Sequence, residues 1–172
     1  MMLPPAHRIA RYNYPARTTA FAFTFLVLGL LWIERSRFNG IEIAAAVLSF
    51  LVYPHLAYVY ACIAVDSKRA ELNNLLVDCA LLGLWTAQIQ FALWPLVGML
   101  GALCLNKAGH GHLRGLLVGV ALFALTAIAW AGLRGIEPVF STGPLVSGAC
   151  ALGILAYMSG VGVLVFEQNK IL

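Results

Sequence analysis

Residues 18–33 read TTAFAFTFLVLGLLWI, a run without a charged side chain that ends at Glu34 and Arg35. A helix of roughly 20 mainly apolar residues spans a bilayer core about 30 Å thick. Basic residues precede this run, as they precede the apolar part of a signal peptide. The run is too long for a signal peptide, however, and no small-residue cleavage pattern follows it. We therefore interpret 18–33 as a first membrane helix.

The whole chain has the composition of a membrane protein. Of its 172 residues, 62% are hydrophobic and 10% are charged, and the mean hydropathy is +0.88. Soluble domains are about 45–50% apolar and about 25% charged. A soluble fold of this length could not bury so much apolar surface, whereas a lipid bilayer can cover it. The composition therefore predicts an all-α integral membrane bundle with the lipid bilayer as its partner.

Five further apolar runs follow the first one. They cover residues 41–62, 73–91, 96–106, 115–133 and 144–166. The fourth run overall, 96–106, is short, which predicts a helix that is tilted, is partly re-entrant or thins the bilayer locally. We expect a basic segment over 1–17, a six-helix transmembrane domain over 18–166, and the start of a cytoplasmic linker helix over 167–172.

The distribution of lysine and arginine predicts the orientation. If the N-terminus is cytoplasmic, the cytoplasmic side holds Arg8, Arg11, Arg17, Lys68, Arg69, Lys107, Arg114 and Lys170. The other side then holds Arg35, Arg37 and Arg134. Cytoplasmic segments of membrane proteins carry the excess of positive charge, so this orientation is favoured. Six spans return the chain to the same side, and both termini are expected in the cytoplasm.

Ionisable residues inside membrane helices are costly, and each one suggests a functional site. His55 and Asp78 lie in the second and third apolar runs, at similar predicted depths near the cytoplasmic edge. Glu71, Asn74 and Asp78 share one helical face because they are spaced at i, i+3 and i+7. Asn106 reaches the same level. We therefore predict a polar cluster of His55, Asn74, Asp78 and Asn106.

Three interpretations of this cluster remain open. Its members could hold helices together by hydrogen bonds, could act as a sensing or proton-coupled switch, or could bind a ligand or metal directly. Pro54, beside His55, removes a backbone donor from the second helix and predicts a kink that could act as a hinge.

Other patterns argue against several kinds of site. No stripe of Arg and Lys interleaved with aromatic residues is present, which argues against a nucleic-acid partner. The four cysteines lack paired spacing, and His110 and His112 alone are too few ligands to predict a metal site. Only one carboxylate is clearly within an apolar run, which gives general acid–base catalysis little support. We predict no catalytic residue, metal or cofactor.

The last apolar run contains small residues at a spacing that permits close helix contact. Ala149 with Gly153 and Ala156 with Gly160 form two small-xxx-small pairs. These pairs predict tight packing within the bundle or against a second copy, and we expect a homodimer.

Several of these motifs together resemble a known family. The segments Tyr53-Pro54-His55-Leu56-Ala57, Ala64-Val65-Asp66, Glu71-x-x-Asn74-x-x-x-Asp78 and Cys104-Leu105-Asn106 are similar to the second class of membrane-associated sensor domains, MASE type 2. The resemblance implies a six-helix domain of the bacterial inner membrane that precedes a diguanylate cyclase or, less commonly, a class III adenylate cyclase. Its pattern falls on Pro54, His55, Asp66, Glu71, Asn74, Asp78 and Asn106, with Asp66 and Glu71 in a cytoplasmic loop motif.

These residues contain no Gly-Gly-Asp/Glu-Glu-Phe motif or other cyclase signature. The resemblance therefore implies an input and dimerisation module that regulates a fused catalytic domain, and no enzyme activity in the chain itself. Its signal could be an apolar small molecule, protons or the state of the membrane. The alternatives are a small transporter or channel subunit in which Asp78 relays protons or cations, and a simple anchor.

Overall fold

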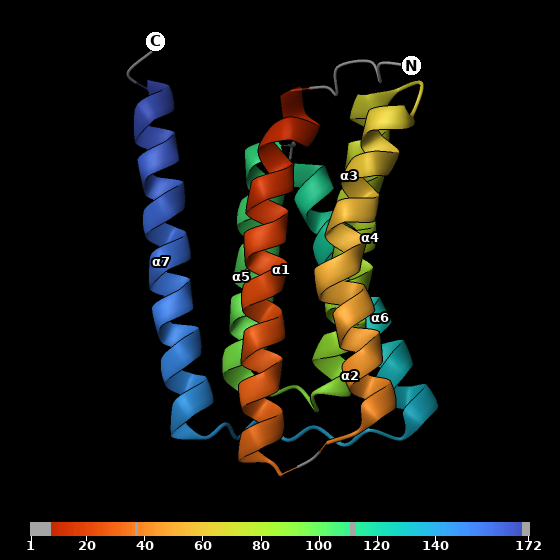
Figure 1. The fold of residues 1–172 in the computed structure, drawn as a ribbon, viewed down its shortest axis with the longest axis vertical. Coiled ribbons are helices and arrows are strands. Elements are labelled where there is room, and N and C mark those ends of the chain that lie inside the picture. Colours follow the sequence, from red (N-terminus) through yellow and green to blue (C-terminus); the bar gives the residue numbers. More distant parts are fainter. Residues whose placement is uncertain (1–7, 37, 111–112, 170–172) are drawn as a thin grey trace.

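The structure is a computed structural model that describes residues 8–36, 38–110 and 113–169. These residues form a bundle of helices, shown in Figure 1, and none of the described residues lies in a β-strand. The elements in chain order are α1 (Arg8–Glu34), α2 (Gly40–Ala46), η1 (Val47–Val52), α3 (Tyr53–Ile63), α4 (Ser67–Gln88), α5 (Leu93–His110), α6 (Leu113–Arg134) and α7 (Pro144–Asn169). The prediction of an all-α fold is confirmed.

Helices α2, η1 and α3 follow one another without a break and form one continuous helical column, in which the hydrogen-bonding pattern changes. It begins at α2, where the side chain of Asn39 accepts a hydrogen bond from the backbone N–H of Ile41. It then passes through the π-helical turn η1 directly before Pro54, which lies in the first turn of α3. Proline cannot donate a backbone hydrogen bond, so the preceding turn cannot close as an α-helix at that residue. The distortion predicted at Pro54 is therefore a π-helical turn, and its role as a hinge stays a prediction.

Two helices begin earlier than the sequence pattern predicts. Helix α1 begins at Arg8, so the predicted start of the first helix at Thr18 is wrong, and Arg17 lies well inside α1. Helix α4 begins at Ser67, after Asp66 has capped it by accepting a hydrogen bond from the N–H of Arg69. Glu71 is therefore a helical residue and does not belong to a loop motif.

The short fourth helix expected over 96–106 is also wrong. Helix α5 contains 18 residues, which corresponds to a length of about 27 Å at 1.5 Å per residue. It is longer than expected because the chain turns sharply before Leu93, where Gln90 and Phe91 both adopt positive φ values of 58°. Two left-handed residues reverse the chain in very few positions, and the helix can start almost at once.

Three helical columns among the described residues are long and apolar enough to cross a membrane. They are Ile9–Glu34, Gly40–Ile63 and Leu113–Arg134, and two shorter apolar helices cover Leu93–Cys104 and Pro144–Gly160. Helix α4 differs from these because its inward face carries charged and amide side chains. The bundle therefore has an apolar exterior with polar groups gathered inside one part of it.

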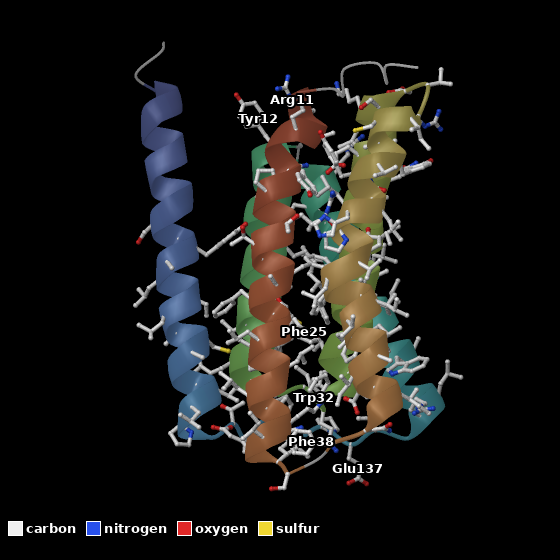
Figure 2. All side chains as sticks on the ribbon, viewed as in Figure 1. Arg11, Tyr12, Phe25, Trp32, Phe38 and Glu137 are labelled. Atoms are coloured by element: carbon white, nitrogen blue, oxygen red, sulfur yellow. The ribbon has the colours of Figure 1, made fainter. Side chains whose placement is uncertain are left out.

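The start of α1 and the end of α7 lie at the same end of the bundle (Figure 1). Arg11 marks this end in Figure 2, while Phe38 and Glu137 mark the opposite one. Helix α4 packs against α6 and α3, and α7 lies at the edge beside α5 and α1. The shared core is rich in aromatic rings, with Phe50 packed between Phe21 and Trp85.

Glu34 joins the end of α1 to the start of α7. Its carboxylate accepts hydrogen bonds from the N–H groups of Gly143, Leu145 and Val146 at 2.9–3.1 Å. A carboxylate at a helix N-terminus satisfies free N–H groups and interacts favourably with the helix dipole. The acidic residue that ends the first apolar run therefore also fixes the last helix.

We expect Glu34→Ala to lower the free energy of unfolding by about 1–2 kcal/mol, since it removes this capping carboxylate. Hydrogen exchange should show faster opening of the first turn of α7. Glu137→Ala is the matched control, because Glu137 is exposed at the same end of the bundle. Equal exchange in the two variants would contradict the capping role.

Candidate functional site

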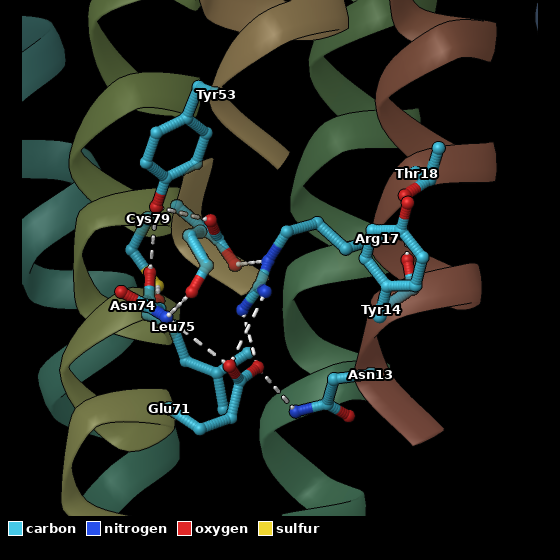
Figure 3. A network of polar contacts seen from close by, with 11 residues as sticks. Asn13, Tyr14, Arg17, Thr18, Tyr53, Glu71, Asn74, Leu75 and Cys79 are labelled. Carbon is cyan, nitrogen blue, oxygen red and sulfur yellow. Dashed lines mark hydrogen bonds and ion pairs between the residues drawn. The ribbon is translucent and has the colours of Figure 1, made fainter. Parts of the chain in front are cut away.

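Six polar side chains from three helices meet inside the bundle, and we call them the buried ionic cluster. Helix α1 contributes two, the start of α3 one and α4 three. Figure 3 shows Asn13, Arg17, Tyr53, Glu71 and Asn74 pointing toward one another. The members are Asn13, Arg17, Tyr53, Glu71, Asn74 and Asp78. Glu71 is 0% exposed and Arg17 is 3% exposed, so the central ion pair is removed from solvent.

Helical spacing explains why these residues converge. Glu71, Asn74 and Asp78 follow at i, i+3 and i+7 on α4, and Asn13 and Arg17 follow at i and i+4 on α1. Residues at these spacings lie on one face of a helix. The inward face of α1 therefore presents an amide and a guanidinium to the carboxylates of α4.

Arg17 is the centre of the cluster. Its Nη2 donates to Glu71 Oε1 at 2.6 Å, its Nη1 to Glu71 Oε2 at 3.5 Å and its Nε to Asp78 Oδ2 at 2.9 Å. The guanidinium therefore bridges two carboxylates that lie two helical turns apart on α4. Among the described side chains, Arg17 is the only cation within ion-pair distance of either carboxylate.

Neutral groups complete the hydrogen bonds of the two carboxylates. Asn13 Nδ2 donates to Glu71 Oε1 at 3.0 Å, and Asn74 Nδ2 donates to Glu71 Oε2 at 3.3 Å and to the backbone oxygen of Ala57 at 2.8 Å. The Tyr53 hydroxyl lies 2.9 Å from Asp78 Oδ1. Every carboxylate oxygen of the cluster thus has a partner, and α1, α3 and α4 are joined through polar contacts.

The structure brings together only part of the predicted cluster. Asn74 and Asp78 lie on one inward face of α4, as their spacing predicts, and Glu71 joins them. The predicted pairing of His55 with Asp78 is wrong. His55 is exposed, and its Nδ1 shares a hydrogen bond of 2.8 Å with the Tyr14 hydroxyl. The side chain of Asn106 lies outside the described residues, as do those of His110 and His112.

The sequence interpretation missed Arg17, Asn13 and Tyr53. Arg17 directly precedes the apolar run, which made it look like one of the cytoplasmic charges that orient a membrane protein. The i, i+4 spacing of Asn13 and Arg17 was a usable signal, since it places both on one helical face. Two acidic residues on the inward face of α4 also required a buried cation.

The small residues of α7 divide between two environments. A Cβ atom on Gly153 would clash with the ring of Phe23 on α1, so Gly153 serves packing within the chain. Ala149 is half-buried. Ala156 and Gly160 are exposed, and nothing lies within 4 Å of a Cβ added to Gly160. The first pair therefore faces this bundle, and the second is open to lipid or to another copy.

A cavity of about 420 Å³ lies at the opposite end of the bundle from the ionic cluster. Gln88 and Gln90, at the end of α4, line it together with Arg35 and Glu42. Arg35 donates to Gln90 Oε1 at 3.0 Å and to the backbone oxygen of Ile89 at 3.1 Å. These bonds hold the left-handed turn between α4 and α5.

The family model of the MASE2 domain matches residues 12–101, just over half of the chain. This chain belongs to the MASE2 family. The matched range contains all six members of the buried ionic cluster. MASE2 domains are membrane-associated sensor domains, so the resemblance to this family is confirmed, although the matched range ends before the Cys104-Leu105-Asn106 segment.

Curated relatives of this MASE2 chain are similar over part of their length. The probable diguanylate cyclases DgcC of Escherichia coli K12 and of Escherichia coli O6:H1 are each 35% identical to it over 94 residues. The aligned region is 55% of this chain and 25% of either relative, so the chain spans about a quarter of the proteins it matches. No solved structure matches it significantly.

Proposed function

We propose that this MASE2 domain is the membrane-embedded input domain of a fused cytoplasmic diguanylate cyclase. The family supplies the sensor role, and the relatives named as probable diguanylate cyclases favour that enzyme over a class III adenylate cyclase. The catalytic step belongs to the fused domain. This chain receives the signal and changes the arrangement of its helices.

The proposed topology has six membrane spans, with both ends on the cytoplasmic face of the bacterial inner membrane. Three apolar columns long enough to span, two shorter apolar helices and the common end of α1 and α7 support it. In this topology α4 is the third span along the chain and completes the set of six, and the surrounding helices shield its charged face from lipid. The distribution of positive charge supports the cytoplasmic orientation of both ends.

One observation carries the proposal: the range that matches the family model contains a buried network of charges that joins three helices. A sequence with no function for these charges could replace them with apolar residues at little or no cost in stability. A buried ionic network instead defines one arrangement of α1 against α3 and α4. A signal that altered one member would favour another arrangement of these helices.

We propose further that two copies pair in the membrane. A cyclase of this type needs two catalytic domains to face each other, and pairing raises their effective concentration. Ala156 and Gly160 on the exposed face of α7 would permit close approach of a second copy. Helix α7 leads directly toward the fused domain and would transmit the rearrangement to it.

The transporter alternative lacks a comparable observation. Asp78 would have to release and rebind cations along a water path, but Arg17 and Tyr53 occupy its oxygens. Flux of protons or cations into liposomes that contain the purified chain would nevertheless favour this alternative.

The proposed function predicts that Asp78→Asn in the fused protein changes cyclic di-GMP output by roughly fivefold or more, the usual lower range for coupling between sites. The substitution fixes this member of the network in an uncharged form without changing its shape. Output is measured over a range of pH in membranes with equal amounts of each protein.

Asp66→Asn is the matched control, because Asp66 is exposed and asparagine caps a helix as well as aspartate does. A second control replaces residues 1–172 with a foreign dimeric membrane helix. The sensory role is refuted if Asp78→Asn and the foreign anchor both leave output at the level of the unaltered protein.

A further inference from the structure

The buried ionic cluster holds one guanidinium and two carboxylates. The titratable and charged groups that face Asp78 are Arg17 from α1, Tyr53 from α3 and Glu71 from α4. Helix α6 carries charges only near its ends, at Arg114 and Arg134, and the described side chains of α5 include no charged residue. With both carboxylates ionised, the buried ionic cluster would carry a net negative charge in a region shielded from water, and burying an unbalanced charge costs free energy.

Tyr53 reveals where an additional proton would fit. Its hydroxyl oxygen lies 2.9 Å from Asp78 Oδ1 and 3.2 Å from the backbone oxygen of Asn74. The hydroxyl has a single proton to donate. If Asp78 is ionised, both neighbours are acceptors, and only one of them can receive that proton. A proton on Asp78 Oδ1 resolves this conflict, because Asp78 then donates to Tyr53 and Tyr53 donates to Asn74.

Glu71 offers no equivalent position. Its Oε1 receives protons from Asn13 and Arg17, and its Oε2 receives them from Asn74 and Arg17. The amide of Asn74 is fixed in this orientation, because its Nδ2 also donates to the backbone oxygen of Ala57. A proton on either oxygen of Glu71 would point at a donor. The same geometry that favours a carboxylic acid at Asp78 therefore favours a carboxylate at Glu71, where the guanidinium of Arg17 contacts both oxygens.

We propose that Asp78 is a proton-binding site, with the proton on Oδ1 and shared with the Tyr53 hydroxyl, and that a proton is the ligand of this sensor domain. Binding converts the carboxylate to a carboxylic acid, and the proton comes from the aqueous phase. In the bound state Arg17 balances Glu71 alone. Release leaves two carboxylates against one guanidinium, which would shift the packing of α1 against α4. The signalling consequence rests on the proposed function, whereas the site itself does not.

Infrared spectroscopy of the full protein in lipid nanodiscs tests the site, because a carboxylic acid has a carbonyl stretch that carboxylates and amides lack. We expect this band at neutral pH in the unaltered protein, its loss in Asp78→Asn and its retention in Glu71→Gln. Tyr53→Phe removes the hydrogen-bond acceptor of the acid, and the band should move to higher frequency.

Stability provides a matched comparison of the two carboxylates. Asp78→Asn should keep the melting temperature within about 2 °C, since an amide reproduces the donor and acceptor of the protonated acid. Glu71→Gln places an amide NH₂ against donors and should lower the melting temperature by roughly 3–10 °C.

An unaltered protein without the band, or a band that survives in Asp78→Asn, overturns the proposal. If Glu71→Gln does not fold, Tyr53→Phe still tests the proposed site. A band at the same frequency in Tyr53→Phe would mean that the protonated group is not hydrogen-bonded to Tyr53. The spectrum is recorded without reference to cyclase activity. Suppose that the band is assigned to Asp78 and that cyclic di-GMP output in Asp78→Asn equals that of the unaltered protein both where the band is present and at higher pH where it is lost. This result would contradict the proposed function and leave the proton site standing.

Discussion

Arg17→Met is expected to destabilise the domain by about 3–5 kcal/mol, the usual effect of removing one partner from a buried ion pair. Arg17 is 3% exposed and donates to both Glu71 and Asp78. Methionine fills much of the same space, so the loss comes mainly from carboxylates left without their cation. Unfolding of the protein in mixed micelles, followed by circular dichroism, measures the effect.

Arg11→Met is the matched control on the same helix. Arg11 is exposed at the end of the bundle where α1 begins (Figure 2), and its replacement is expected to change stability by less than about 0.5 kcal/mol. If Arg17→Met proves as stable as Arg11→Met, Arg17 does not hold the two carboxylates in the native domain.

A combined variant separates stability from signalling. Replacing Arg17 and Glu71 with methionine and Asp78 with leucine removes every charge of the cluster together. Apolar replacement of a complete buried ionic set is often neutral or stabilising, so most of the lost stability should return. The same variant should make the output of the fused cyclase insensitive to the signal, because the titratable group is gone.

The sequence placed three of the six cluster members on one helical face because one helix contributes them, although only Asn74 and Asp78 were included in the predicted cluster. Glu71, Asn74 and Asp78 are close in sequence, and helical periodicity alone places them on one face. The partner was wrong because depth in the membrane does not specify rotation about the helix axis. Tyr53 points at Asp78, and His55 lies two residues further on, roughly 200° around the helix. His55 therefore faces away.

Long-range pairing explains the remaining differences. Nothing near Glu34 in the sequence indicates that it caps a helix that begins at Pro144, because the chain passes through six other helical elements before it returns. Arg17 could be interpreted as an orienting charge because positive residues beside an apolar run commonly have that role. Only the arrangement of α1 beside α4 shows that it is a buried partner. The presence of a helix can thus be predicted from the local sequence, whereas the rotation of the helix about its axis and the helices it packs against cannot.

Gly83→Ala is the second variant with a large expected effect. A Cβ atom on Gly83 would clash with the backbone oxygen of Phe123 and with Oγ1 of Thr126 on α6. The obstacle is mainly backbone, which cannot move aside as the end of a long side chain can. We expect a loss of about 1–3 kcal/mol in the free energy of unfolding, as for other overpacked interiors.

Gly101→Ala is the matched control, because Gly101 is also helical and nothing lies within 4 Å of its added Cβ atom. There alanine should stabilise the helix by up to about 1 kcal/mol, since it lowers the entropy of the unfolded chain. The two substitutions are chemically identical and opposite in expected sign. Equal effects would mean that α4 and α6 are not in backbone contact. The opposite signs would instead identify Gly83 as the residue that allows α6 to cover the charged helix so closely.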